Sequence, residues 1–187
     1  YKHDGHKIID QFISLINPKR KIQPYVQNLT GISNKMLRNA PEFFEVAKRI
    51  VEMTNDCVLV AHNAKFDYRI LKLEFSRLGF QFERKSLCTV ELSKKLIPGL
   101  PSYSLGKLVR SLGIPISDRH RASGDALATI KLFEILLNRD VTKEVIKTSI
   151  RIKPKLQIEP KLSSLIESMT CDTGIYYMYD CNGEIIY

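Results

Sequence analysis

The chain has 187 residues and a mass of 21.5 kDa, and 44% of its residues are hydrophobic, which is enough for one good-sized core and an appendage. Its net charge of +9 and pI near 9.4 favour an anionic partner such as nucleic acid. No run approaches the roughly eighteen apolar residues of a membrane helix, and the four cysteines form no CxxC pair. These features argue against a membrane protein and a structural zinc site, and they predict a cytoplasmic protein with reduced thiols.

The chain opens on a predicted β-hairpin. Asp4 and Gly5 lie between two extended runs, and an Asp-Gly pair in that position is a strong signal for a tight turn. The first of the two runs is almost absent, because only three residues precede the turn. We therefore expect that residue 1 is not the natural start of the protein. A natural short form with a truncated edge strand is the alternative.

Strands and helices then alternate along the chain. The apolar run 58–61 is rich in β-branched residues and predicts a buried strand. The other elements expected are a short helix capped by Ser33, a helix over 41–53, a helix over 65–78 ended by Gly79, a strand over 85–88, and helices over 89–96, over 105–112 with Ser104 as its cap, and over 122–137. This alternation predicts an α/β domain with a mixed sheet.

Asp67 is the first candidate functional residue. It follows strand 58–61 and lies in the first turn of the next helix, where open α/β sheets place their ligand sites. A single carboxylate in a first turn is commonly explained by its favourable interaction with the helix dipole. A metal ligand is the alternative reading, and it gains support if other carboxylates converge on the same place.

His120 and Asp125 form the second candidate group. Apolar residues from Ala122 onward recur at helical spacing, so Asp125 lies near the start of a helix and His120 just before it. His120 can titrate near neutral pH, although a histidine before a helix can equally be a surface or capping residue. If Asp67 and Asp125 flank one end of the sheet, their oxygen ligands suit Mg²⁺ or Mn²⁺ better than Zn²⁺.

These residues resemble the motifs of a known family. The run from Asn63 to Asp67, NAKFD, resembles the second motif of the DEDDh 3′–5′ exonucleases, and His120 followed five positions later by Asp125 resembles the third. The proofreading subunit of bacterial DNA polymerase III and its homologues are the relatives that the motifs resemble most. The resemblance covers residues 1–138 and implies a ribonuclease H-like fold, with a mixed sheet flanked by helices.

The resemblance also implies a role for each matching residue. Asp67 and Asp125 would be ligands of a two-metal Mg²⁺ or Mn²⁺ site, and His120 would be the general base that activates the attacking water. The residues that would line the site for the 3′-terminal nucleotide are His62, Asn63 and Phe66. The family's first motif, Asp-x-Glu, should lie upstream of the Asp4–Gly5 hairpin, where this sequence has no residues. We therefore expect these 187 residues by themselves to bind metal poorly and to be nearly inactive.

Two further segments are expected after the exonuclease domain. Residues 139–161 are rich in lysine and arginine with few large apolar side chains, which predicts a partly extended basic linker. Residues 162–187 are expected to form a short helix and a hairpin that turns at Asn182–Gly183. Gly174-Ile175-Tyr176, with Tyr187 eleven positions later, resembles the opening of a GIY-YIG nuclease domain, in which Tyr176 and Tyr187 would belong to the active site. An added edge ribbon is the structural alternative for this hairpin.

The function implied is release of nucleoside monophosphates from single-stranded or frayed 3′ ends of DNA, in DNA repair or replication fidelity, with a polymerase or repair protein as a possible partner. Two alternatives stay open. The motifs do not identify the sugar, so an RNA-trimming exonuclease of the same fold fits them equally. A non-catalytic module that binds nucleic acid or a polymerase would also retain the groove.

Overall fold

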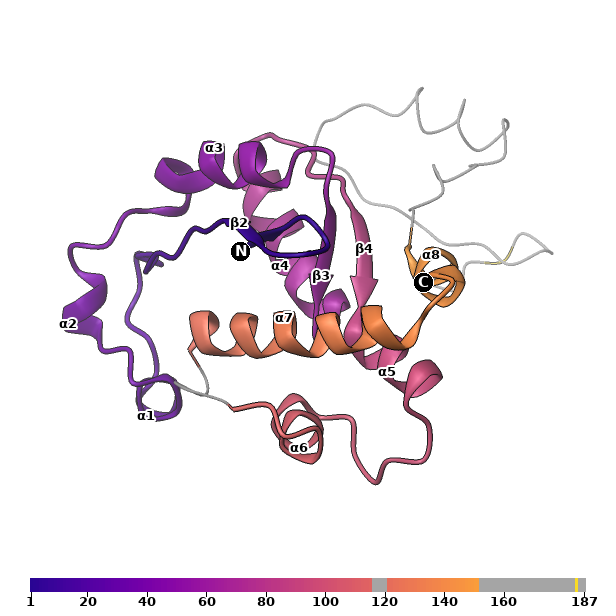
Figure 1. Cartoon of the computed structure of the whole chain (residues 1–187). Helices are drawn as coiled ribbons and strands as arrows, with labels where there is room; N and C mark the ends of the chain where they lie inside the picture. The colour runs from indigo at the N-terminus through magenta and orange to yellow at the C-terminus, as the bar shows by residue number, and fades with distance from the viewer. Residues whose placement is uncertain (116–120, 152–183, 185–187) are drawn as a thin grey trace, which may run out of the picture. The chain divides into compact units, whose positions relative to one another are not determined.

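The computed structural model describes residues 1–115, 121–151 and 184. The chain divides into two compact units, Tyr1–Ile152 and Lys153–Tyr187. All of the helices and strands described belong to the first unit (Figure 1). In chain order they are β1 (Lys2–His3), β2 (Ile8–Asp10), α1 (Pro24–Thr30), α2 (Asn34–Leu37), α3 (Phe43–Thr54), β3 (Val58–Ala61), α4 (Ala64–Arg77), β4 (Lys85–Cys88), α5 (Thr89–Leu96), α6 (Leu105–Ser111), α7 (Ala122–Arg139) and α8 (Glu144–Ser149).

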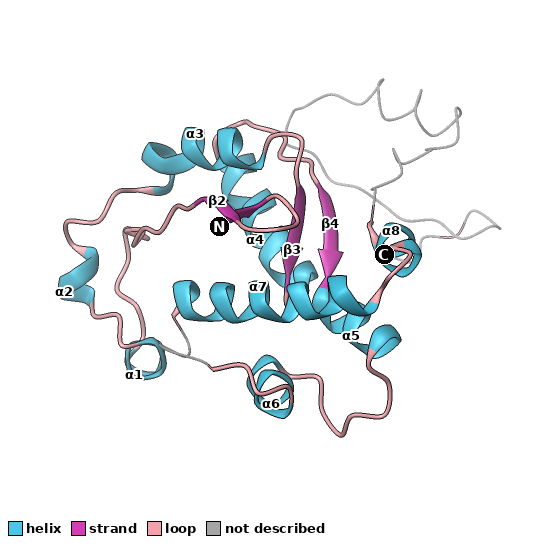
Figure 2. Ribbon diagram, viewed as in Figure 1, coloured by secondary structure: helices cyan, strands magenta, loops and turns pink. Residues whose placement is uncertain are grey.

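A parallel strand pair forms the centre of this unit (Figure 2). β3 and β4 pair in register from Val58 opposite Lys85 to Ala61 opposite Cys88. Parallel strands need a crossover connection, and α4 supplies it. Gly79 ends that crossover with a φ of 72°, a conformation that glycine adopts without steric cost. The predicted strand–helix–strand order from 58 to 88 is confirmed.

Alternate residues of β3 pack against different helical layers. Val58 and Val60 lie in one core cluster with buried residues of α5, α6 and α7, whereas Leu59 lies in a second cluster with residues of α3 and α4. This separation follows from the two-residue period of a strand, which sends neighbouring side chains to opposite faces. The unit therefore has three layers, with helices on both sides of the β3–β4 pair. An α/β architecture is confirmed.

The N-terminal hairpin is attached to both helical layers. β1 and β2 pair antiparallel, and the Asp4 carboxylate accepts hydrogen bonds from the His6 and Lys7 amides at 2.8 Å each, which closes the predicted turn. The Asp10 carboxylate accepts two hydrogen bonds, at 2.6 and 2.7 Å, from the Arg49 guanidinium of α3, and a third at 2.8 Å from the Gln11 amide. On the other side, His3 Nε2 lies 3.1 Å from Glu134 Oε1 of α7.

The prediction of one mixed sheet is wrong for the described residues. Their strands form two separate two-stranded sheets, β1–β2 and β3–β4. β1 and β3 are not paired with each other, and both line a cavity of about 1110 Å³. The same cavity explains why β3 is only half-buried, although its apolar sequence predicts a fully buried strand.

Two local features also differ from the expectations. No helix was expected over 24–30, where the structure has α1, which has Pro24 in its first turn and ends at Gly31 with a φ of 66°. Ser33 caps α2 by accepting from the Met36 amide at 3.3 Å, as expected, but the Ser104 side chain makes no such bond at α6. Instead, Ser104 Oγ lies 3.3 Å from Ser102 Oγ.

Residues 140–151, which belong to the segment 139–161 expected to be a linker, pack on the first unit. Asp140 is 4% exposed, and its carboxylate accepts a hydrogen bond at 2.8 Å from the amide of Ile146, a buried residue of α8. Arg151 pairs with Ser86 of β4 as an antiparallel bridge and with the Glu91 carboxylate at 2.6 Å. These contacts fix residues 140–151 on the first unit. Apart from Glu184, the rest of the C-terminal segments predicted over 152–187 lies outside the described residues.

No helix in the described ranges 1–115 and 121–151 combines the length and apolar character needed to cross a membrane. The longest of them, α7, carries Asp125, Lys131 and Glu134 among its 18 residues.

Replacement of Phe75 by alanine is expected to lower the free energy of unfolding by about 3–5 kcal/mol, because it deletes a fully buried ring from the core. Phe75 is 1% exposed, stacks on Phe82 with 4.5 Å between ring centroids, and meets Phe43 edge-on at 5.1 Å. Urea unfolding measures the change. Phe44→Ala is the matched control, since Phe44 is 58% exposed and its loss should cost less than about 1 kcal/mol. Equal losses for the two variants would contradict the assignment of the core.

Candidate active site

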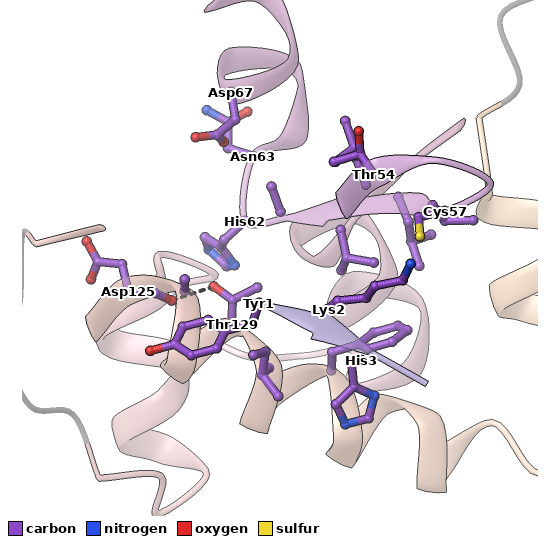
Figure 3. A pocket seen from close by; sticks show the side chains of 18 of the residues that line it. Tyr1, Lys2, His3, Thr54, Cys57, His62, Asn63, Asp67, Asp125 and Thr129 are labelled. Atoms are coloured by element: carbon purple, nitrogen blue, oxygen red, sulfur yellow. Dashed lines mark hydrogen bonds between the residues drawn. The ribbon is translucent and has the colours of Figure 1, made fainter. Parts of the chain in front are cut away.

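The cavity of about 1110 Å³ runs along β3 and carries the predicted site residues at one of its ends (Figure 3). The rest of its lining combines apolar side chains of β3 and α7 with polar side chains such as Lys2, His3 and Thr54. The lining residues at the polar end are His62, Asn63, Phe66, Asp67 and Asp125. They come from the β3–α4 connection and from the start of α7, so two segments far apart in sequence meet at one place.

The sharp turn after β3 positions Asp67. Asn63 adopts the left-handed conformation with a φ of 72°, which asparagine tolerates better than most residues. Its carbonyl accepts from the Phe66 amide at 2.9 Å, which starts α4 immediately. Asp67 therefore lies in the first turn of α4, as expected, and the Phe66 ring beside it is 56% exposed.

Asp125 reaches the same pocket from the first turn of α7. The preceding Gly124 is buried, so the helix start lies close to its neighbours. The Asp125 backbone carbonyl accepts from the Thr129 hydroxyl at 2.8 Å, which is the bond drawn dashed in Figure 3. Within the described part of the chain, its carboxylate has no hydrogen bond or ion pair. In Figure 3, Asp67 and Asp125 lie on the same side of the pocket, and His62 lies between them in this view.

His62 is held through both of its ring nitrogens. Nε2 lies 2.9 Å from the Tyr103 carbonyl oxygen, which can only accept, so Nε2 carries a proton and donates it. Nδ1 lies 3.0 Å from Thr89 Oγ1. In a neutral imidazole Nδ1 is then an acceptor, and the Thr89 hydroxyl donates to it. The two contacts select one neutral tautomer of His62.

Burial in the pocket shifts two pKa values, and the neighbouring charges oppose both shifts. Burial lowers the pKa of His62 below its ordinary value, although the hydrogen bond to Tyr103 and the nearby carboxylates of Asp125 and Asp67 oppose that shift. Part of Asp67 stays exposed to solvent, yet desolvation by surrounding protein atoms raises the pKa of its carboxyl group, against the smaller effect of His62. Both carboxylates therefore favour the charged form of one imidazole, that of His62.

The pocket offers the type of ligand that a hard divalent cation prefers, carboxylate oxygen, but fewer carboxylates than the family resemblance implies. Two carboxylates are suitable oxygen ligands for Mg²⁺ or Mn²⁺. The described residues contain no group of three or more His, Cys, Asp or Glu side chains placed to hold a metal ion. They bring together Asp67 and Asp125, which are two of the four acidic ligands that the family resemblance implies.

Five of the residues singled out in the sequence line this pocket, whereas the residues that support His62 were not among them. His120, Tyr176 and Tyr187 lie outside the described residues. The residues not anticipated are Thr89 and Tyr103. A signal for Thr89 was available, because it directly follows β4 just as His62 directly follows β3, and parallel strands end at the same edge of a sheet. No pattern in the sequence indicates the contact between His62 and Tyr103, which are 41 positions apart.

Three comparisons relate the chain to known proteins. The RNase_T family model, described as "Exonuclease", matches residues 1–133. A protein named 3′-5′ exonuclease DinG from Staphylococcus epidermidis is 41% identical over 128 residues, which are 68% of this chain and 14% of that protein. DinG from Staphylococcus aureus strain USA300 is 38% identical over 129 residues, with the same two shares. The chain thus spans about one seventh of the length of these curated relatives.

A solved structure is similar as well. It is titled "Exonuclease X in complex with 5′ overhanging duplex DNA", and it superposes with a TM-score of 0.62 at 26% sequence identity. The similarity covers 75% of this chain and 80% of that one. The chain and that exonuclease are therefore similar in the arrangement of their helices and strands as well as in sequence. This similarity agrees with the predicted ribonuclease H-like fold class.

The depressed pKa of His62 predicts how stability depends on pH. An unfolded histidine titrates at about 6.5, so the unfolded chain binds more protons than the folded chain just below that pH. The stability that neutral His62 contributes is present above pH 6.5 and is lost as the pH falls towards its folded pKa. NMR titration of the His62 ring should give a midpoint below 6.5. The stability difference between the wild type and His62→Asn should also shrink between pH 7 and pH 5. A midpoint above 6.5 would contradict the desolvation argument.

Proposed function

Because the chain belongs to the RNase_T exonuclease family, we propose that its first 138 residues form a metal-dependent exonuclease domain that hydrolyses DNA from the 3′ end to nucleoside monophosphates. The observation that carries the proposal is the meeting of Asp67, Asp125 and His62 in one pocket, on the elements that the family motifs predict. The curated relatives are named 3′-5′ exonucleases, which supports the same polarity here.

The proposal gives roles to several residues in or near the pocket. Asp67 and Asp125 would hold a Mg²⁺ or Mn²⁺ ion, which when bound would stabilise the negative charge that develops on the reacting phosphate. His120 would act as the general base, by its place in the third motif. The exposed ring of Phe66 offers an apolar face for the terminal base, and Arg69 lies 5.9 Å from its centroid, where a cation can also meet a phosphate. Asn63 is exposed at the same mouth.

DNA is the proposed substrate, in the form of single-stranded or frayed 3′ ends. The similar Exonuclease X structure is bound to a duplex with 5′ overhangs, and such a duplex has recessed 3′ ends. The net charge of +9 favours a polyanion, although charge alone does not separate DNA from RNA. The same proposal includes a role in DNA repair or replication fidelity. It also includes a polymerase or repair protein as partner and a cytoplasmic location. RNA trimming stays the second candidate.

The proposed activity of these 187 residues by themselves is low. Two carboxylates bind a divalent ion more weakly than four, and the described residues provide two. The proposed division of the chain keeps an exonuclease domain over 1–138 and the start of a GIY-YIG domain over 162–187, with Tyr176 and Tyr187 in its site. That second domain rests on its motif alone and lies beyond the family match at residues 1–133. The proposed linker between the domains narrows to residues 152–161, because the preceding residues are packed.

Asp67→Asn and Asp125→Asn in the natural full-length protein are each expected to lower the rate of 3′-end degradation by a factor on the order of 100 or more, because each removes a charge from the metal site. The assay follows a labelled single-stranded DNA with Mg²⁺ or Mn²⁺. Glu52→Gln is the control, since Glu52 is an exposed charge on α3 outside the cavity, and it should keep the wild-type rate.

The same assay separates the alternatives. Faster hydrolysis of a matched RNA oligomer than of the DNA would favour the RNA-trimming enzyme. Tight binding of DNA without cleavage by the full-length protein would instead support a non-catalytic binding module. Unchanged cleavage by both aspartate variants would overturn the proposed site.

A further inference from the structure

We propose that Thr89 is a positioning residue of this site, and that it acts through His62 to hold the chain from Leu100 to Gly106 as one wall of the pocket. The inference deepens the proposed function, because that wall would face the nucleic-acid end. It also changes the role of His62, which the family resemblance places against the substrate. In this account His62 supports the wall and does not itself bind the nucleotide.

The first step is the placement of Thr89 beside His62. Ala61 and Cys88 are the last paired residues of the parallel strands, so His62 and Thr89 follow at equivalent positions on the same edge. Thr89 is 0% exposed, and its hydroxyl oxygen lies 3.0 Å from His62 Nδ1 and 3.4 Å from the Ala61 carbonyl oxygen. The Thr89 hydroxyl has one proton to donate. We assign it to His62 Nδ1, because this contact is the shorter of the two and Nδ1 of neutral His62 has no other donor among the described residues.

The second step is the link from His62 to the wall. His62 Nε2 donates to the Tyr103 carbonyl at 2.9 Å. Tyr103 in turn holds its own segment together, since its hydroxyl donates to the Ile97 carbonyl at 2.8 Å and accepts from the Leu100 amide at 3.4 Å. The residues that continue from Tyr103 and line the pocket are Ser104, Leu105 and Gly106. Among the described residues, the hydrogen bond between this segment and the end of β3 is made by the His62 ring, while Leu100, Tyr103 and Leu105 also pack against the core cluster that includes Val60.

The third step concerns what remains free on His62. Both ring nitrogens have protein partners, so neither can contact a nucleotide or a metal ion without breaking one of the bonds to Thr89 or Tyr103. The three groups act as one unit, which we name the His62 clasp: Thr89, His62 and the Tyr103 carbonyl. The simpler alternative is that Thr89 is only a buried helix residue. In that case valine, which has nearly the same shape, would replace it without any effect on the site.

The test compares Thr89→Val with Thr89→Ser in the natural full-length protein. Valine keeps the shape and removes the hydroxyl, whereas serine keeps the hydroxyl. Ser93→Ala is the matched control, because Ser93 is a buried residue one turn further along α5 whose hydroxyl has no partner among the described residues. Two readouts are needed: the ¹⁵N chemical shifts of the His62 ring in the free protein, and KM and kcat for degradation of single-stranded DNA.

The clasp predicts a specific pattern. In the wild type the ¹⁵N shifts should show a proton on Nε2 and a hydrogen-bonded Nδ1. Thr89→Val should move the Nδ1 signal towards that of a free imidazole nitrogen and raise KM about tenfold, the factor that corresponds to one lost hydrogen bond, with kcat within about twofold. Thr89→Ser should restore both values, and Ser93→Ala should change neither.

Other results overturn the proposal. An unchanged Nδ1 signal in Thr89→Val, or a serine variant that behaves like valine, would refute the contact. A fall in kcat at constant KM would place Thr89 in the chemical step and refute its positioning role. If Thr89→Val does not fold, Tyr103→Phe is tested in its place. This variant should raise KM and leave the Nδ1 signal of His62 unchanged. An unchanged KM would refute the proposal that residues 100–106 form a wall of the pocket. If the wild type shows no nuclease activity, the proposed function fails separately, and the spectra together with the DNA dissociation constants still decide on the clasp.

Discussion

The parallel pairing of β3 with β4 is the constraint on which the rest of the structure depends. It requires the crossover helix α4, and it sends Val60 and Leu59 to opposite helical layers. It also ends both strands at one edge, so that His62 and Thr89 become neighbours although 27 positions separate them. The pocket residues are thus a direct consequence of strand register. A shift of one residue in that register would separate the two side chains and reverse the faces of the strands.

The electrostatics of the pocket follow from the same packing. Burial of His62 between the helical layers disfavours its charged form, while its two hydrogen bonds hold the neutral ring in one orientation. The nearby carboxylates of Asp67 and Asp125 retain their oxygen atoms for another positive charge. Because His62 is kept neutral, it does not compete for them. A cation from solution is the simplest partner for two such carboxylates, and a DNA phosphate can then approach an otherwise negative site.

Most of this arrangement could be predicted from local sequence, and the exceptions have physical reasons. The bounds of β3, β4 and α5 follow from apolar runs and helical spacing, and the rule that ligands bind at the carboxyl ends of strands anticipated where Asp67 lies. The short helix α1 was missed because its seven residues include no buried side chain, so no apolar periodicity marks it. The packing of α8 and the contact of His62 with Tyr103 depend on residues far apart in sequence. Neither leaves a local pattern.

NMR with substoichiometric Mn²⁺ tests most directly whether Asp67 and Asp125 form one divalent-cation site. The paramagnetic ion broadens the amide signals of residues near it, whether or not the protein cleaves DNA. We expect the Asp67 and Asp125 signals to broaden together, excess Mg²⁺ to reverse the effect, and Asp67→Asn to weaken it at both positions. Broadening at only one of the two residues, or at neither while exposed surface carboxylates such as Glu52 respond, would contradict it.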